Sequence, residues 1–236
     1  MSPIPRRFRP RLAPSLAVAI LLPLFLYLGY WQLQRADEKR VLQAEYDARA
    51  TGAVAMVERR LQRPEALQFY RVVAKGHYEA DRQILIDNRV HQGRVGYHVI
   101  TPLRLLDSDV RLLVNRGWIA AGTRRDVLPQ VPTPAGTTTV EGIAIVPSGH
   151  IFELDTKTEE AIVWQNLVLA RYAKWSGLKL QPVVLQQTSD AADGLVRAWT
   201  RPDTGADKHR GYAFQWYSLA STILIAYVAF SFKRAA

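Results

Sequence analysis

One histidine, His209, is followed at helical spacing by two aromatic residues, Tyr212 and Trp216, and lies between two cations, Lys208 and Arg210. Residues three and four apart share one face of a helix, so the three ring side chains would form a single stripe. An imidazole can ligate a haem iron, aromatic rings can pack on a macrocycle, and guanidinium groups can pair with carboxylates. The pattern therefore suits a flat, apolar, anionic ligand such as a haem.

A second stripe of the same kind occurs near the start of the chain. Leu28, Trp31 or Gln32, Arg35 and Lys39 recur at three- and four-residue spacing. Aromatic and cationic residues are also the ordinary anchors of helices at a membrane surface. The two stripes thus predict either a ligand groove between two helices or a pair of interfacial anchors, and residue types alone leave both open.

Other site chemistry finds little support in the sequence. The chain has no cysteine, which excludes thiolate catalysis and cysteine metal sites. No GxSxG, P-loop or GxGxxG motif occurs, and no two histidines have metal-ligand spacing. The histidines are at positions 77, 91, 98, 150 and 209. We therefore do not expect an enzyme.

Two stretches without any charged residue, 12–34 and 211–232, lie near the two ends of the chain. About 20 apolar residues in a helix span the hydrocarbon core of a bilayer, so each stretch predicts a transmembrane helix. The residues between them, 35–210, are mixed in polarity and predict an extramembrane domain. Short basic tails, 1–11 and 233–236, complete the organisation.

The distribution of positive charge predicts the orientation of this chain. Six cations flank the outer ends of the two helices: Arg6, Arg7, Arg9, Arg11, Lys233 and Arg234. Cytoplasmic flanks carry such an excess, so both termini are expected in the cytoplasm and the domain outside it. These six account for much of the net charge of +10, and 10 − 6 leaves +4 for the rest. Nucleic-acid binding needs a concentrated basic surface and is not expected.

The first apolar stretch favours a retained anchor over a cleaved signal peptide, because no small-x-small site follows it. The tail before it is short and interrupted by three prolines, Pro3, Pro5 and Pro10, which disfavours the amphipathic helix of a mitochondrial transit peptide. We therefore expect a bacterial inner-membrane protein, in contact with membrane lipid.

The middle of the chain changes from helical to alternating periodicity. The first helix should continue to about Ala50, and a short helix should run from Asn166 to a C-cap at Gly177. Six strands are predicted, in "FYRVVAKGHY", "RQILIDNRV", "GYHVITPLRLL", "VRLLVNRGWIA", "TTTVEGIAIV" and "QPVVLQQT". The first two strands should form one hairpin, and the next two should flank the turn "DSD". The expected fold is membrane-anchored α+β, with two transmembrane helices flanking a mostly antiparallel sheet or small barrel.

The most distinctive stretch of the predicted domain is Asn115, Arg116, Gly117 and Trp118. A glycine beside a large aromatic residue at a strand end is typical of a turn that ends the strand. On this interpretation Trp118 fills the core and Arg116 is solvated.

Four motifs resemble the Surfeit-locus family of cytochrome c oxidase assembly factors: "LGYWQLQRADEK", "GYHVITPL", "LVNRGWI" and "HRGYAFQWYSLA". They occur in order over almost the whole chain. One departure is Ala120, where the family pattern usually has proline. The resemblance implies a bacterial factor that binds haem A and helps to insert it into the large catalytic subunit of an aa-type oxidase.

The resemblance also implies a role for one residue: His209 occupies the motif position of the proposed axial ligand of the haem iron. With His209 as the ligand, geometry alone places Tyr212 and Trp216 against the macrocycle and pairs Arg35 or Arg210 with a propionate, and these four roles are hypotheses.

A scaffold that holds the oxidase subunit without binding haem is the main alternative, and haem A synthase is a further partner to consider. The partner-facing residues would then be Trp31, Gln32, Asn115, Arg116, Gly117, Trp118 and Gln215. A membrane-anchored domain for an unrelated envelope ligand is a third reading, which the motifs disfavour.

Overall fold

A computed structural model describes residues 6–122, 124, 127–147, 162–199 and 205–234. The chain divides into two compact units, one of residues 1–44 with 201–236 and one of residues 45–200. The predicted tails and His150 lie partly or wholly outside the described residues.

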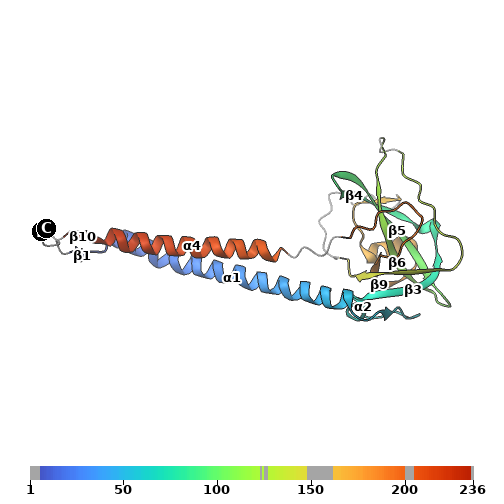
Figure 1. Ribbon diagram of the computed structural model, residues 1–236, viewed down its shortest axis with the longest axis horizontal. Coiled ribbons are helices and arrows are strands. Elements are labelled where there is room, and N and C mark those ends of the chain that lie inside the picture. Colours follow the sequence, from blue (N-terminus) through green and yellow to red (C-terminus); the bar gives the residue numbers. More distant parts are fainter. Residues whose placement is uncertain (1–5, 123, 125–126, 148–161, 200–204, 235–236) are drawn as a thin grey trace. The chain divides into compact units, whose positions relative to one another are not determined.

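The first unit is built on two long helices, α1 (Leu12–Thr51) and α4 (Ala206–Ser231), which lie side by side (Figure 1). Both are long and apolar enough to cross a membrane. α1 runs through Pro23 and ends within a residue or two of the predicted Ala50. α4 begins at Ala206, before the uncharged stretch, so that His209 belongs to its first turn.

The two helices pack along a seam in which less exposed positions alternate at spacings of three and four. On α1 these positions are Ser15, Val18, Leu22, Phe25, Gly29, Gln32 and Ala36, and on α4 they are His209, Ala213, Trp216, Ala220, Ile223 and Tyr227. This spacing is that of left-handed coiled-coil packing. Small residues allow close approach, and a Cβ on Gly29 would lie 2.8 Å from the ring of Tyr217.

Beyond the helices the two ends of the described chain pair with each other. Strand β1 (Arg6–Phe8) runs antiparallel to β10 (Phe232–Arg234). The N–H of Arg9 donates to the carbonyl of Ser231 at 2.8 Å, which continues this pairing toward the helices. The segments that were expected to be simple basic tails thus form a short ribbon.

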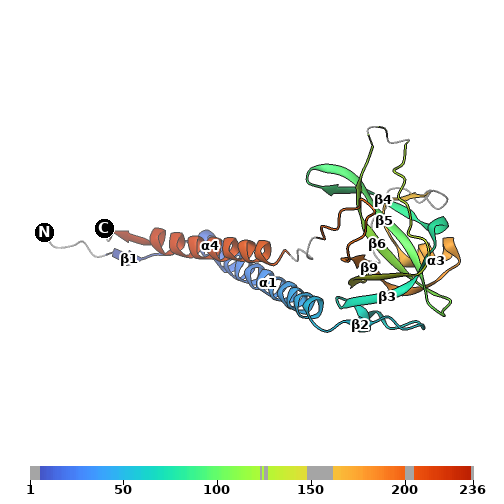
Figure 2. The same cartoon turned by 45° about the vertical axis from the view of Figure 1, so that its right-hand side comes forward.

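Among the described residues, the second unit contains a sheet of eight strands with three short helical segments (Figure 2). The strands are β2 (Ala55–Met56), β3 (Arg71–Tyr78), β4 (Ile84–His91), β5 (Arg94–Leu105), β6 (Val110–Ala120), β7 (Thr138–Ile145), β8 (Val163–Trp164) and β9 (Lys179–Gln187). The helical segments are α2 (Pro64–Leu67), the 3-10 turn η1 (Ala80–Arg82) and α3 (Leu169–Ser176).

Five of these strands close into a barrel, because β3 pairs with β7, β7 with β9, β9 with β6, β6 with β5, and β5 with β3 again. Closure occurs at Gly76, which pairs with Thr138 of β7 and with Leu105 of β5. A Cβ at Gly76 would lie 2.1 Å from the carbonyl oxygen of Arg104, so only glycine fits this corner.

The interior of the barrel is a continuous apolar cluster. Its most buried members include Val72, Leu103, Leu112, Val140 and Leu185, one from each closing strand. A second cluster lies beneath α3 and contains Trp164 and Tyr172. The predicted α+β architecture with a barrel-like domain is therefore confirmed.

Several details of the predicted topology are confirmed and others are wrong. β5 and β6 form the expected hairpin, and Gly177 caps α3 in the left-handed conformation at φ 70°. α3 begins at Leu169 instead of Asn166. Three pairings are parallel: β2 with β3, β4 with β8, and β6 with β9.

The predicted hairpin of β3 with β4 does not form, since β3 pairs with β7 and β5 while β4 pairs with β5 and β8. Between the two strands, Glu79 is attached to the neighbouring hairpin. Its N–H donates to the carbonyl of Pro102 at 2.9 Å, and its carboxylate pairs with Arg111 at 2.9 Å. The 3-10 turn η1 then redirects the chain away from a tight hairpin.

Candidate functional site

His209 is bound to the neighbouring helix. Its Nδ1 lies 2.7 Å from the side-chain oxygen of Gln32, and its backbone N–H donates to the carbonyl of Gly205 at 3.2 Å. Because an amide oxygen only accepts, Nδ1 must carry the proton in this contact. In the neutral imidazole the lone pair then lies on Nε2. The structure therefore places a ring nitrogen able to ligate a metal at the polar end of the helix pair.

The aromatic residues of the predicted stripe separate in the structure. Trp216 lies on the seam one heptad after His209, and its ring packs against Phe25 at 5.6 Å between centroids. Tyr212 is 53 % exposed, and Leu219 is also exposed. Tyr212 and Leu219 lie off the seam, because Ala213 and Ala220 occupy the corresponding seam positions, and the contact of Tyr212 with a macrocycle stays a prediction.

The two cations proposed for an anionic ligand differ in their surroundings. Arg35 donates to Glu38 at 2.7 Å and lies 6.0 Å from the ring of Trp31. Arg210 is exposed, and no ion pair is found for it among the described residues. A bound anion would therefore compete with Glu38 for Arg35 but would meet Arg210 unpaired.

Of the residues predicted to face a partner on the helices, the structure brings only Gln32 to the seam. Trp31 and Gln215 are exposed. Gln215 lies on an outer face of α4 with Phe214, Ser218 and other residues that line a shallow hollow. Trp31 and Gln215 are thus available to a partner in the membrane unit, whereas Gln32 is engaged by His209.

Arg116 is buried, with 1 % of its surface exposed, so the expectation that it is solvated is wrong. Its guanidinium donates to Asp193 at 3.1 Å, to the carbonyl of Pro132 at 2.9 Å and to Gln83 at 3.3 Å. It also lies 5.3 Å from the ring of Tyr78. A second cation, Arg197, also binds the carboxylate of Asp193, at 2.6 Å. This buried network replaces the solvent that the arginine was expected to contact.

The pKa values of two groups reflect this network. Burial raises the pKa of Tyr78 to about 12, although the charge of Arg116 acts in the opposite direction. Burial alone would raise the pKa of Asp193, but hydrogen bonds from Arg197 and from the N–H of Leu195 lower it on balance. Asp193 is therefore held in its ionised form between two arginines.

The rest of the Asn-Arg-Gly-Trp stretch attaches a late segment of the domain to β6. The backbone N–H and carbonyl of Trp118 both bond to Val196, and its indole N–H donates to the carbonyl of Arg89 at 2.7 Å. Gly117 has φ 146°, and a Cβ there would lie 2.8 Å from Leu195. Trp118 is buried as expected, and Asn115 is buried as well. A partner-binding role for this stretch stays a prediction, and its side chains act in the interior of the fold.

A further hollow of about 460 Å³ was not foreseen from the sequence. Arg89, His91, His98, Trp118 and Trp199 are among the residues that line it. Burial, assisted by the charge of Arg89, lowers the pKa of His98 to about 4, so this imidazole is neutral at physiological pH. His98 and Trp118 belong to two of the quoted motifs and pair in register across the predicted β5–β6 hairpin. Setting the register of that hairpin would have brought these two side chains of the hollow together.

Among the residues that the structure describes, no group of three or more His, Asp or Glu side chains could hold a metal ion. A haem needs only one protein ligand to its iron. His209 offers one such imidazole, oriented through the contact of its Nδ1 with Gln32.

Comparison with known proteins identifies the family. A model of the SURF1 family matches residues 19–221, which is most of the chain. The chain belongs to the SURF1 family. A SURF1-like protein of Rickettsia bellii is 25 % identical over 219 residues, covering 90 % of this chain and 88 % of the relative. The Surfeit locus protein 1 of Mus musculus is 26 % identical over 213 residues, covering 82 % and 68 %.

Membership of the SURF1 family confirms the resemblance that the four motifs carry. The matched region begins inside α1 and ends inside α4, so it includes both the helices and the barrel domain. The family is one of cytochrome oxidase assembly factors and is not a known enzyme family. The relatives include bacterial and animal proteins.

Proposed function

We propose that this SURF1-family chain binds haem A and assists its insertion into the large catalytic subunit of an aa-type cytochrome c oxidase. The chain would work in a bacterial inner membrane, with both termini in the cytoplasm and the barrel domain outside. Haem A synthase would be the source of the cargo. Haem A brings the redox-active iron that the oxidase requires, and the chain would bind and orient it for transfer.

One observation carries this proposal: the hydrogen bond of His209 Nδ1 to Gln32 at 2.7 Å. Ligating histidines usually donate their other ring nitrogen to an acceptor, which fixes the tautomer and the orientation of the ring. Gln32 supplies such an acceptor from the opposite helix. An imidazole already held in this way binds a metal with little reorganisation.

The neighbouring residues would hold the rest of the haem. Trp216, on the seam, offers an apolar surface for the macrocycle, and Tyr212 could contribute its exposed ring from the side. Arg210 is the better partner for a propionate, because Arg35 is already bonded to Glu38. These contacts are part of the proposal.

The scaffold alternative has support from the same hydrogen bond. A polar pair between two membrane helices also stabilises their association without any ligand, typically by about 0.6 kcal/mol. In that case His209 and Gln32 would only hold α1 against α4, and the exposed Trp31 and Gln215 would meet the oxidase subunit. The two functions differ in whether the protein retains haem.

The test is an absorption spectrum, oxidised and reduced, of the full chain purified in detergent after co-expression with haem A biosynthesis. Four proteins are compared: wild type, His209→Ala, Gln32→Leu and His77→Ala. His77 is a matched control, since it is a partly exposed histidine of the barrel domain with one hydroxyl contact, to Thr137. We expect haem A bands in wild type and His77→Ala, weakened or shifted bands in His209→Ala, and an intermediate loss in Gln32→Leu.

The outcomes separate the two functions. Equal haem content with unchanged band positions in wild type and His209→Ala would remove His209 as the ligand. Absence of haem from all four proteins, each folded and inserted, would favour the scaffold. In a fifth protein, joint substitution of Arg35 and Arg210 without any loss of haem would remove the propionate pairing.

A further inference from the structure

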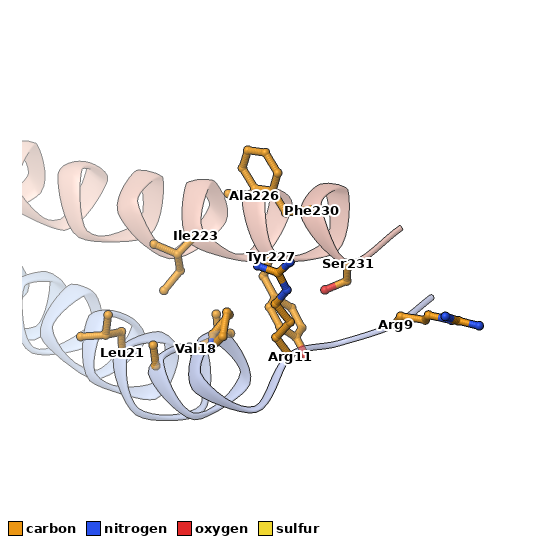
Figure 3. Close-up of a pocket in the computed structure, with 11 residues that line it drawn as sticks. Arg9, Arg11, Val18, Leu21, Ile223, Ala226, Tyr227, Phe230 and Ser231 are labelled. Carbon is orange, nitrogen blue, oxygen red and sulfur yellow. The ribbon is translucent and has the colours of Figure 1, made fainter. Parts of the chain in front are cut away.

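A groove of about 610 Å³ lies between the first turns of α1 and the last turns of α4 (Figure 3). One wall comes from α1, with Val18 and Leu21, and the other from α4, with Ile223 and Phe230. The groove lies within the membrane unit, and its walls belong to the two candidate membrane spans. Its walls are therefore suited to an acyl chain.

Two arginines, Arg9 and Arg11, line the same groove and give it a cationic end. Both are exposed, and no ion pair is found for either among the described residues. The sequence explains this, because no acidic residue occurs from the first residue to Ala36 or from Lys208 to the last. No acidic side chain of residues 1–36 or 208–236 is therefore available to neutralise these two guanidinium groups.

The hydroxyl groups at this end are already bonded to each other. Tyr227 and Ser15 lie 2.7 Å apart between their oxygens, across the two helices, and Ser15 also donates to the carbonyl of Arg11 at 2.8 Å. Arg11 and Tyr227 both line the groove (Figure 3). The hydrogen bond between Ser15 and Tyr227 thus holds the two helices together at the groove. The guanidinium groups of Arg9 and Arg11 remain available to an anionic ligand.

We propose that this groove binds an acidic phospholipid, with the phosphate at Arg9 and Arg11 and an acyl chain along the apolar walls. Basic pockets between membrane helices bind anionic lipid head groups through this combination of charge and apolar surface. The inference is independent of the proposed haem site, since none of the residues proposed to hold the haem lines this groove. A bound acidic lipid would attach both helices to one leaflet and stabilise their pairing at this end.

A third protein helix is a less suitable occupant. It would have to present a carboxylate to the two arginines at the membrane surface and an apolar face below it. Acidic phospholipids have both parts in one molecule and surround the groove at high concentration. The charge of the groove therefore favours the lipid.

The experiment is native mass spectrometry of the full chain, released from nanodiscs that contain equal amounts of phosphatidylglycerol and phosphatidylcholine. The test variant is Arg9→Gln with Arg11→Gln. The matched control is Arg40→Gln with Lys208→Gln, which removes the same charge from exposed positions of the membrane unit outside the groove. A third variant, Ala226→Leu, fills the groove without changing its charge.

We expect wild type and control to retain phosphatidylglycerol in preference to phosphatidylcholine. Each membrane-surface cation strengthens binding of an anionic lipid about fivefold, so the double arginine variant should lose about twenty-fivefold. Ala226→Leu should also reduce retention. Equal retention of the two lipids by wild type would overturn the proposal. So would an equal loss in test and control variants, or a protein co-purifying in place of lipid.

Discussion

Removal of the carboxylate of Asp193 should strongly destabilise the barrel domain. Asp193 has 6 % of its side chain exposed and lies between Arg116, at 3.1 Å, and Arg197, at 2.6 Å. In Asp193→Ala the guanidinium of Arg116 would stay buried without a counter-charge, because its other partners are a carbonyl and an amide. The two arginines would also repel each other.

The magnitude follows from these contacts. Breaking a buried ion pair by removing one partner costs about 3–5 kcal/mol, which is much of the stability of an ordinary domain. For a domain of this size each kcal/mol lowers Tm by about 2–4 °C, so the expected fall is about 6–20 °C. The matched control is Asp109→Ala, whose exposed pair with Lys179 should be worth at most about 1 kcal/mol.

The assay is thermal and urea unfolding of the full chain, followed by the β-sheet signal in circular dichroism, with wild type, Asp193→Ala and Asp109→Ala side by side. The pH dependence gives a second readout. The pKa of Asp193 is lowered in the fold, so its stabilisation is present above the ordinary value of 3.8 and is lost as the pH falls toward the folded value. Asp193→Ala should lack this acid-dependent part of the stability.

Similar stabilities of Asp193→Ala and Asp109→Ala would refute the reasoning. That result would mean that Arg116 reaches solvent or finds another anion when Asp193 is absent. A large loss in Asp193→Ala that does not depend on pH would also contradict it, because the loss would then come from packing and not from charge.

Two other predictions concern the barrel. Gly76→Ala should prevent closure of β3 on β5, because the new Cβ would lie 2.1 Å from the carbonyl oxygen of Arg104. Hydrogen exchange should then show loss of amide protection in both strands. Intact protection would contradict the requirement for glycine at this corner. His98 has its pKa lowered from 6.5 to about 4, chiefly by burial and further by Arg89, so its contribution to stability is complete above about 6.5 and is lost as the pH falls toward 4. His98→Gln should flatten the stability profile in that window, and an unchanged slope in urea unfolding would contradict the assignment.

Much of the fold could be predicted because it depends on local patterns. The lengths of the two apolar stretches determined the membrane helices, and the alternation around "DSD" determined the β5–β6 hairpin. The cap at Gly177 followed from the need for a left-handed residue at a helix end. Each of these features depends on residues that are near one another in sequence.

The errors concern contacts between residues far apart in sequence. The partners of β3 depend on closure at Gly76 and on the attachment of Glu79 to Pro102 and Arg111, which no local period encodes. The burial of Arg116 depends on Asp193, which lies 77 residues later in the chain. Because arginine is rarely buried without a partner, it is expected in solvent when the local sequence offers no counter-charge.

The seam between the helices shows how small such an error can be. Gln32 was one of two alternatives at its position, and the choice between it and Trp31 depends on one residue of rotation. With a period of three and four, Gly29 and Ala36 select Gln32, since both are small enough to be buried against α4. Small residues thus mark the helix contact, whereas the aromatic residues are divided between the seam, with Trp216, and the surface, with Trp31 and Tyr212.

The family motifs therefore have unlike physical roles, and variants in them should be interpreted differently. Arg116, Gly117 and Trp118 hold the interior of the barrel domain together, so their loss should reduce the amount of folded protein before any partner is involved. His209 lies at the end of a helix pair that keeps Ala213, Ala220 and the other seam contacts without it. A defect in oxidase assembly caused by an Arg116 variant thus reports on stability, whereas one caused by His209→Ala with normal protein levels would report on the site itself.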